Sequence, residues 1–148
     1  MPTPIINTDA QATPPASDYR PSTAERYMSA AQLAYFRQKL LRWRRTLMEE
    51  ADETLRQLRD QSHRDVGDEV DRATREASQS LDLRTRDRCR KLLRKIDEAL
   101  VRIDDGSYGF CEETGEPIGL ARLEARPIAT LSLEAQQRRE IRERQSRF

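Results

Sequence analysis

Carboxylate side chains crowd one short stretch near the middle of the chain, where a turn is expected. Their oxygens could bind metal ions or basic groups inside a partner's cleft. The same residues would also suit an ordinary turn that leads into a helix, because aspartate caps helices and favours their positive N-terminal end. Both interpretations stay open from the residues alone. The acids are Asp60, Asp65, Asp68, Glu69 and Asp71.

Positive side chains gather in two later stretches. For any single arginine, a solvated helix face is the simpler interpretation. Several guanidinium groups that meet could instead bind phosphate, because arginine offers paired donors to phosphate oxygens. The first stretch contains Arg84, Arg86, Arg88, Arg90, Lys91, Arg94 and Lys95. The second contains Arg122, Arg126, Arg138, Arg139, Arg142, Arg144 and Arg147.

A possible metal site has lost most of its ligands. Cys111 and Thr114 stand at CxxC spacing, and Ser132 and Ala135 repeat that spacing downstream. A structural zinc needs four nitrogen or sulfur ligands, usually from two matched CxxC pairs. These four positions supply one thiol, and the lone histidine, His63, lies far away along the chain. The residues therefore predict no structural zinc and no metal ligands.

Catalytic patterns are missing from the sequence. It contains no nucleophile elbow, no glycine-rich phosphate loop and no HExxH. None of its acids lies in a segment apolar enough to raise the pKa of a carboxyl group. We therefore expect that the protein is not an enzyme and has no catalytic residues.

The composition favours long helices over one round core. Hydrophobic and charged residues each make up 36% of the 148 residues, and the formal net charge is +1. Helices that bury only narrow apolar stripes suit this balance. No apolar run approaches the roughly 20 residues that span a bilayer, and the N-terminus lacks the order of a signal peptide. A cytoplasmic protein is expected.

Two stretches carry apolar residues at alternating steps of three and four, which is heptad spacing. Ser29 can cap the first helix, and Gly67 and Asp68 suit a turn before the second. Arms of about 30 to 35 residues predict an antiparallel hairpin about 45 to 50 Å long, with a polar tip. The first stretch contains Leu33, Phe36, Leu40, Trp43 and Leu47. The second contains Cys89, Leu93, Ile96, Leu100 and Ile103.

Five stretches resemble the DksA/TraR family of RNA polymerase-binding factors, and the resemblance covers about residues 27–147. The patterns DxxDxA at the tip and RLEARP near the C-terminus are far more specific than a generic coiled coil. The matching stretches are Ala31–Phe36, Asp68–Ala73, Arg86–Leu93, Tyr108–Cys111 and Arg122–Pro127.

The resemblance implies a mainly α fold, a long antiparallel coiled-coil hairpin on a small globular domain. Residues 1–28, which contain five of the seven prolines, are expected to form a flexible N-terminal arm that docks near Tyr19 and Tyr27. Residues 29–105 would form the coiled coil, with its tip at 63–71. Residues 106–148 would form a degenerate zinc-finger-like domain with a C-terminal helix.

The resemblance also implies a function. Similar proteins bind RNA polymerase directly, insert their hairpin into its secondary channel, and alter the stability of open promoter complexes during the stringent response. Their tip residues match Asp68, Asp71 and Ala73. A cytoplasmic monomer that makes no sequence-specific DNA contact and no membrane contact is expected.

The implied effector is the alarmone guanosine tetraphosphate (ppGpp). By motif position, Arg88, Lys95 and Arg126 match the residues that similar proteins use to bind it. Gln136 replaces a basic residue that is usual in the family and so removes one charge from this site.

Family members with zinc carry cysteine at positions 111, 114, 132 and 135, and three of these are replaced here. The resemblance therefore implies a zinc-independent variant. Its finger-like part within residues 106–148, called the knuckle, would be held by apolar burial. The side chains expected to hold it are Phe110, Ile118, Leu120, Leu123, Ile128, Leu131 and Leu133.

Three alternatives remain. A transcript-cleavage factor of the Gre type also enters the secondary channel with an acidic tip, although RLEARP favours the DksA side. A nucleic-acid-binding coiled-coil arm would need a basic face, whereas acidic residues at the tip would repel phosphate. A purely structural coiled coil would explain the heptads but would leave DxxDxA as a coincidence.

Overall fold

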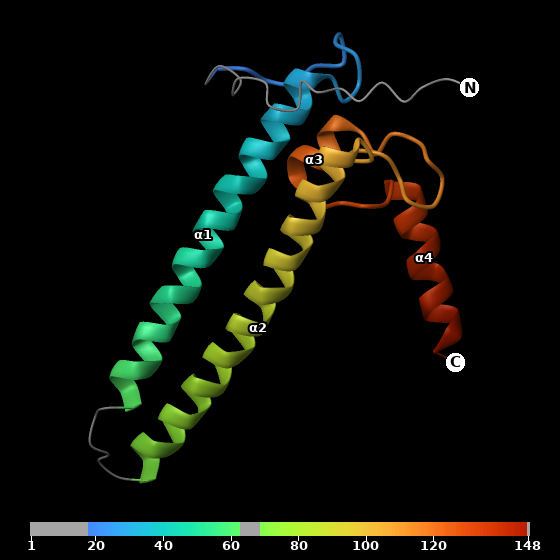
Figure 1. Cartoon of the computed structure of the whole chain (residues 1–148). Coiled ribbons are helices and arrows are strands. Elements are labelled where there is room, and N and C mark those ends of the chain that lie inside the picture. The colour runs from blue at the N-terminus through green and yellow to red at the C-terminus, as the bar shows by residue number, and fades with distance from the viewer. Residues whose placement is uncertain (1–17, 63–68, 148) are drawn as a thin grey trace. The chain divides into compact units, whose positions relative to one another are not determined.

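The computed structural model describes residues 18–62 and 69–147. This part of the chain is mainly α-helical, as predicted (Figure 1). Its only β-type pairing is an isolated antiparallel bridge between Phe110 and Pro117. None of its helices combines the length and the low charge that crossing a bilayer requires. The helices are α1 (Ala30–Ser62), α2 (Glu69–Asp105), α3 (Leu120–Ala125) and α4 (Leu133–Ser146).

The chain divides into two compact units. Unit 1 comprises residues 1–40 and 98–148, and unit 2 comprises residues 41–97. Helices α1 and α2 each contribute to both units without a break. The predicted division into arm, coiled coil and finger-like domain stays a prediction. Its arm lies largely outside the described residues, and so does most of its tip.

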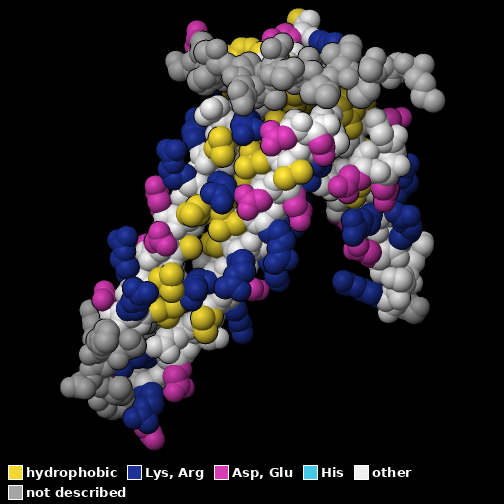
Figure 2. Space-filling view, in the orientation of Figure 1, with side chains coloured by type: hydrophobic (Ala, Val, Ile, Leu, Met, Phe, Trp, Pro, Cys, Tyr) yellow, Lys and Arg dark blue, Asp and Glu magenta, His cyan; other side chains and the backbone are white. Residues whose placement is uncertain are grey.

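In unit 2, α1 and α2 run antiparallel, side by side (Figure 1). Leu47, Cys89 and Ile96 are buried there, and Arg44 Nε lies 2.9 Å from an oxygen of Asp97. Burial of Cys89 confirms its predicted place in the apolar seam. Figure 2 shows hydrophobic side chains along the line between the two helices, surrounded by charged ones.

Packing in unit 2 thins toward the start of α2. No side chain between Glu69 and Arg88 is buried. Val70 is 71% exposed and Leu81 is 63% exposed. Since burial of apolar area is the main stabilising contribution, the start of α2 gains little stability from apolar packing.

Unit 1 holds the dense core, which is built around two aromatic rings. Phe36 and Tyr108 are fully buried, with ring centroids 5.8 Å apart. The Tyr108 hydroxyl donates a hydrogen bond of 2.8 Å to the Pro127 carbonyl. Burial raises the pKa of Tyr108 well above its ordinary value, which keeps this hydroxyl protonated as a donor. The other buried apolar side chains are Tyr35, Leu40, Ala99, Ile103, Cys111, Ile118, Leu123, Ile128, Ala129, Leu131 and Ala135.

Two side chains predicted to hold the knuckle do not do so. Leu133 is 57% exposed because it is the first residue of α4 and faces outward, while Ala135 takes the buried position. Phe110 is 36% exposed and packs edge-on against Tyr27, with ring centroids 5.5 Å apart. Leu120 is half-buried.

The start of α1 is capped by a serine and a glutamine, which accept hydrogen bonds from backbone amides there. Ser29 Oγ accepts a hydrogen bond from the backbone amide of Gln32 at 3.3 Å, which confirms Ser29 as the N-cap. The fully buried Gln32 side chain accepts from the Met28 amide at 2.8 Å and donates to the Ser22 carbonyl at 3.1 Å. The chain before α1 is thereby tied to the helix.

Tyr27 joins this segment to the knuckle, where docking was expected. Its hydroxyl donates to the Gly109 carbonyl at 2.6 Å and accepts from the Gly119 amide at 2.9 Å. Gly109 has φ +88°, and a Cβ there would lie 2.7 Å from Met28 Sδ. Only glycine fits this approach without displacing Met28.

Candidate functional site

The acidic end of unit 2 carries two of the three predicted tip residues within the described part. Asp71 and Ala73 are exposed at the start of α2, and Glu69 adds a second acid to the first turn. Asp68 lies outside the described residues. The arrangement presents carboxylate beside small side chains, with no apolar burial behind it. Such an end can meet a basic or metal-bearing partner surface without steric conflict.

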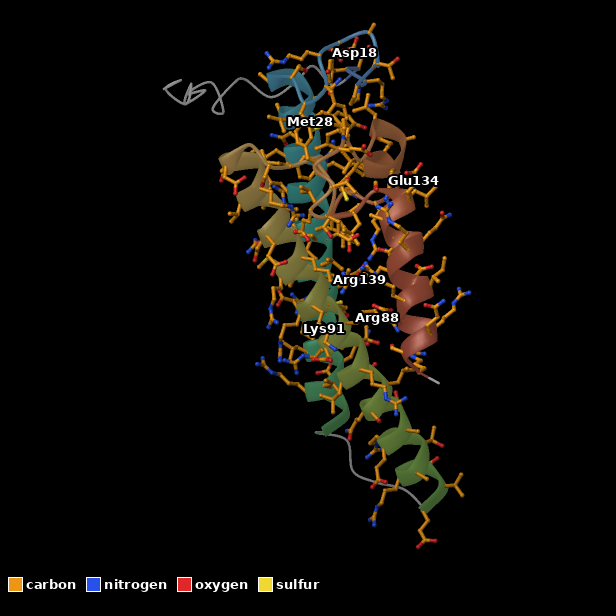
Figure 3. The ribbon with its side chains drawn as sticks, turned by 90° about the vertical axis from the view of Figure 1, so that its right-hand side faces the viewer. Asp18, Met28, Arg88, Lys91, Glu134 and Arg139 are labelled. Carbon is orange, nitrogen blue, oxygen red and sulfur yellow. The ribbon has the colours of Figure 1, made fainter. Side chains whose placement is uncertain are left out.

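A basic face of α2 carries two of the three predicted phosphate-binding residues. Arg84, Arg88, Lys91 and Lys95 recur at steps of four, three and four, which places them on one helix face. All four are exposed, and Figure 3 shows Arg88 and Lys91 projecting from α2. Lys91 pairs with Asp87 at 3.3 Å. No ion pair engages Arg88 or Lys95 within the described residues, so both charges are available.

The third predicted phosphate-binding residue, Arg126, belongs to unit 1. It is the C-cap of α3, and its amide donates to the Arg122 carbonyl at 2.8 Å. Its side chain is exposed and makes no ion pair among the described residues. Arg122 differs, because its Nε donates to the Leu131 carbonyl at 2.9 Å and so holds the knuckle.

The basic residues of α4 are partly neutralised. Arg139 Nε lies 3.3 Å from Glu143, and Arg142 lies 3.0 Å from Glu113. Figure 3 shows Arg139 on the flank of α4. Gln136 donates its side-chain amide to Glu140 at 3.0 Å within the same helix. This supports the interpretation of α4 as a solvated helix face whose charges pair with nearby acids.

The four positions at CxxC spacing lie together in the knuckle. Burial raises the pKa of the Cys111 thiol, but hydrogen bonds from the Thr114 hydroxyl and from the amides of Ser132, Thr114 and Glu113 outweigh it and lower the pKa to about 6. Ser132 Oγ in turn accepts from the Ala135 amide at 3.2 Å. Cys111 is 3% exposed, so a shielded thiolate occupies the site at neutral pH.

Contacts between residues far apart along the chain were missed at the sequence level. Tyr35 and Lys39 of α1 both bind Glu124 of α3, 89 and 85 positions away. No local pattern signals such a contact. The serine cap of α1, in contrast, was readable, because Ser29 immediately precedes the first stretch of heptad spacing.

Two family models match the chain. Residues 32–103 match the N-terminal domain of DnaK suppressor protein DksA, and residues 106–140 match the prokaryotic dksA/traR C4-type zinc finger. The chain is 59% identical over 128 residues to the RNA polymerase-binding transcription factor DksA of Caulobacter vibrioides, which covers 86% of this chain and 89% of that protein. It is 45% identical over 127 residues to the protein of that name from Escherichia coli K12, covering 86% and 83%.

A solved structure agrees with these matches. Transcription factor DksA2 from Pseudomonas aeruginosa superposes with a TM-score of 0.75 at 49% identity. The alignment covers 84% of this chain and 94% of that one. The shared fold therefore includes both long helices and the knuckle.

The zinc-finger match contradicts the prediction that the protein holds no structural zinc. A segment that matches a C4-type finger points to possible zinc binding. The prediction rested on the number of cysteines alone, whereas the knuckle keeps the four ligand positions together around a thiolate. The donors present are one thiolate, at Cys111, and the hydroxyls of Thr114 and Ser132. The described residues contain no group of three or more His, Cys, Asp or Glu that could hold an ion. This set differs from the four thiolates of a C4-type zinc site.

Proposed function

Because the chain belongs to the DksA/TraR family, we propose that it is a transcription regulator that binds bacterial RNA polymerase directly, through the secondary channel of the enzyme. The observation that carries this proposal is the start of α2. It combines exposed acidic residues with a nearly complete lack of apolar burial, on a helix that α1 braces by antiparallel pairing. These exposed acids are accessible to a partner surface.

The tip acts by electrostatics in this proposal. The carboxylates of Asp68 and Asp71 meet basic or mobile catalytic elements of the polymerase, and the small Ala73 allows close approach. A charged hydrogen bond contributes about 1.5–3 kcal/mol. An interaction of that size is enough to change the lifetime of an open promoter complex by a factor of about 10 to 100.

The effector in this proposal is ppGpp, which places the protein in the stringent response. Arg88 and Lys95 of unit 2 and Arg126 of unit 1 each bind its phosphates. The exposure of their side chains supports this role, and so does the absence of ion pairs to them within the described residues. Gln136 brings no positive charge to phosphate binding, and its side-chain amide donates to Glu140.

The protein regulates without catalysing a reaction of its own in this proposal, as a monomer in the bacterial cytoplasm where the polymerase works. A net charge of +1 provides no field that would favour nonspecific binding to nucleic acid. Transcript cleavage, the activity of Gre-type factors, is the outcome that would contradict this assignment. Incubating a stalled elongation complex with the protein tests it directly.

The decisive experiment measures open-complex lifetime on a ribosomal RNA promoter with wild-type protein and with Asp71→Asn. The substitution keeps size and helix but removes the charge, so we expect most of the effect on lifetime to disappear. Glu76→Gln is the matched control, because it removes one charge from the exposed surface of α2 five residues farther on. We expect this control to behave like the wild type. An Asp71→Asn protein with full effect would exclude the proposed role of the tip.

A further inference from the structure

The last turn of α3 is held by α1 through one glutamate. Glu124 Oε1 accepts hydrogen bonds from the Tyr35 hydroxyl at 2.6 Å and from Lys39 Nζ at 2.8 Å. Lys39 Nζ also donates to the Glu124 backbone carbonyl at 2.8 Å. All three residues belong to unit 1. One ammonium group therefore binds both the side chain and the main chain of the same residue.

Helix α3 needs such support. It has only six residues, and no side chain caps its N-terminus. Helices this short are unstable alone, and their last carbonyl groups lack partners within the helix. Lys39 supplies a partner for one of these carbonyls, and the buried Leu123 anchors the helix in the core. The geometry of the C-terminal end of α3 thus depends on Lys39 and Glu124.

Glu124 is ionised in this arrangement. Partial burial raises the pKa of its carboxyl group, but hydrogen bonds from Lys39 and Tyr35, together with the positive charges of Lys39 and Arg20, outweigh burial and lower the pKa. The charge of Lys39 is therefore neutralised by Glu124. Lys39 holds α3 and has no free charge to offer an anion.

Arg126 stands two residues beyond this contact, on a backbone that is fixed on both sides. The Arg126 carbonyl accepts from the Ala129 amide at 3.0 Å, and the next carbonyl, that of Pro127, accepts from Tyr108. The Arg126 side chain, in contrast, is exposed and makes no ion pair within the described residues. The fold therefore presents a free guanidinium group from an immobilised main chain.

We infer that Lys39 and Glu124 are a positioning pair for Arg126, which holds the end of α3 so that the guanidinium meets a phosphate group of ppGpp. This inference rests on the proposed function and names the residues that prepare one of its phosphate-binding groups. Preorganisation of this kind raises affinity because the order of the binding group is established before the ligand arrives.

The test measures the concentration of ppGpp that gives half of its effect on open-complex lifetime, with the full chain and RNA polymerase. Lys39→Met and Glu124→Met keep side-chain length and helix propensity but remove the contact. We expect each to raise this concentration about 2- to 10-fold, the range that corresponds to ordering one flexible side chain. Lys39→Arg restores a donor and should recover part of the loss.

The matched control is Arg37→Met. It removes the ion pair between Arg37 and Asp104, 2.7 Å long and also made by α1 within unit 1, without touching α3. The half-effect concentration should remain that of the wild type. Thermal melting of each variant shows whether the fold is intact. In a variant already carrying Arg126→Ala, Lys39→Met should have no additional effect, since positioning acts only through Arg126.

Three results would overturn the inference in distinguishable ways. If Arg126→Ala leaves the response to ppGpp unchanged, the proposed ppGpp site itself is wrong and the inference fails with it. If Arg126→Ala weakens the response but Lys39→Met does not, the site stands and the positioning role is wrong. If Glu124→Met lowers the half-effect concentration, the released Lys39 binds phosphate directly, which also contradicts positioning.

Discussion

The two units differ in what holds them together. Unit 1 contains thirteen of the sixteen buried apolar side chains found in the described residues, and its contacts link positions up to 92 residues apart. Unit 2 contains the other three, Leu47, Cys89 and Ile96. Within one chain, therefore, one unit provides most of the packing and the other presents charge on exposed helix surfaces. Stability and partner contact can thus be assigned to separate parts of a small protein. Substitutions in unit 1 and in unit 2 should therefore affect different measured properties.

The largest effect should come from the aromatic core of unit 1. Phe36→Ala removes a fully buried ring that packs against Tyr108, so we expect a loss of about 3–5 kcal/mol in the free energy of unfolding. Urea denaturation measures it. Leu81→Ala in unit 2 is the comparison, because Leu81 is 63% exposed and should change stability by no more than about 0.5 kcal/mol. Equal losses in the two variants would remove the contrast between the units.

A smaller effect should depend on pH through Cys111. Its pKa falls from 9.0 to about 6 on folding, so the thiolate stabilises the folded state fully above pH 9, and this contribution is lost as the pH falls toward 6. The difference in unfolding free energy between wild type and Cys111→Ser should therefore grow from pH 6 to pH 8, by roughly 1–3 kcal/mol. Denaturation at several pH values measures this difference. The same series with Cys89→Ser separates the effect from the second thiol, and a flat difference for Cys111→Ser would contradict the assigned thiolate.

The smallest effect should come from the ion pair in unit 2. Arg44 and Asp97 are both partly exposed, with side-chain exposures of 39% and 54%. Arg44→Met should therefore cost less than about 1 kcal/mol, and less still in high salt, because solvent screens such pairs. Thermal melting in low and high salt measures it. A loss as large as that of Phe36→Ala would show that unit 2 depends on its charges far more than its exposure indicates.

Much of the fold could be predicted because its signals are local. Heptad spacing predicted two long helices, and Ser29 marked the start of the first. The knuckle was harder, because its contacts join distant segments. Phe110 and Leu133 are residue types that usually lie in a core. In the structure, however, Phe110 packs edge-on against Tyr27, and Ala135 takes the buried position in place of Leu133.

The assignment of the site residues stays a prediction. Motif positions named Asp71, Ala73, Arg88, Lys95 and Arg126, all of which are exposed in the structure and so are accessible to a partner or ligand. The contact of Lys39 with Glu124 could not be predicted, since it depends on two helices meeting. The metal prediction was wrong because it rested on residue identity alone, whereas the family match reflects the whole segment of residues 106–140.

The unbroken passage of α1 and α2 through unit 2 limits how such a protein can change in length over evolution. An insertion in one helix alone would shift its apolar seam against the other, whereas seven residues added to both arms would keep every knob in a matching hole. Each such paired insertion would extend the arms by about 10 Å. Relatives whose arms differ in length should therefore differ by whole heptads in both arms at once.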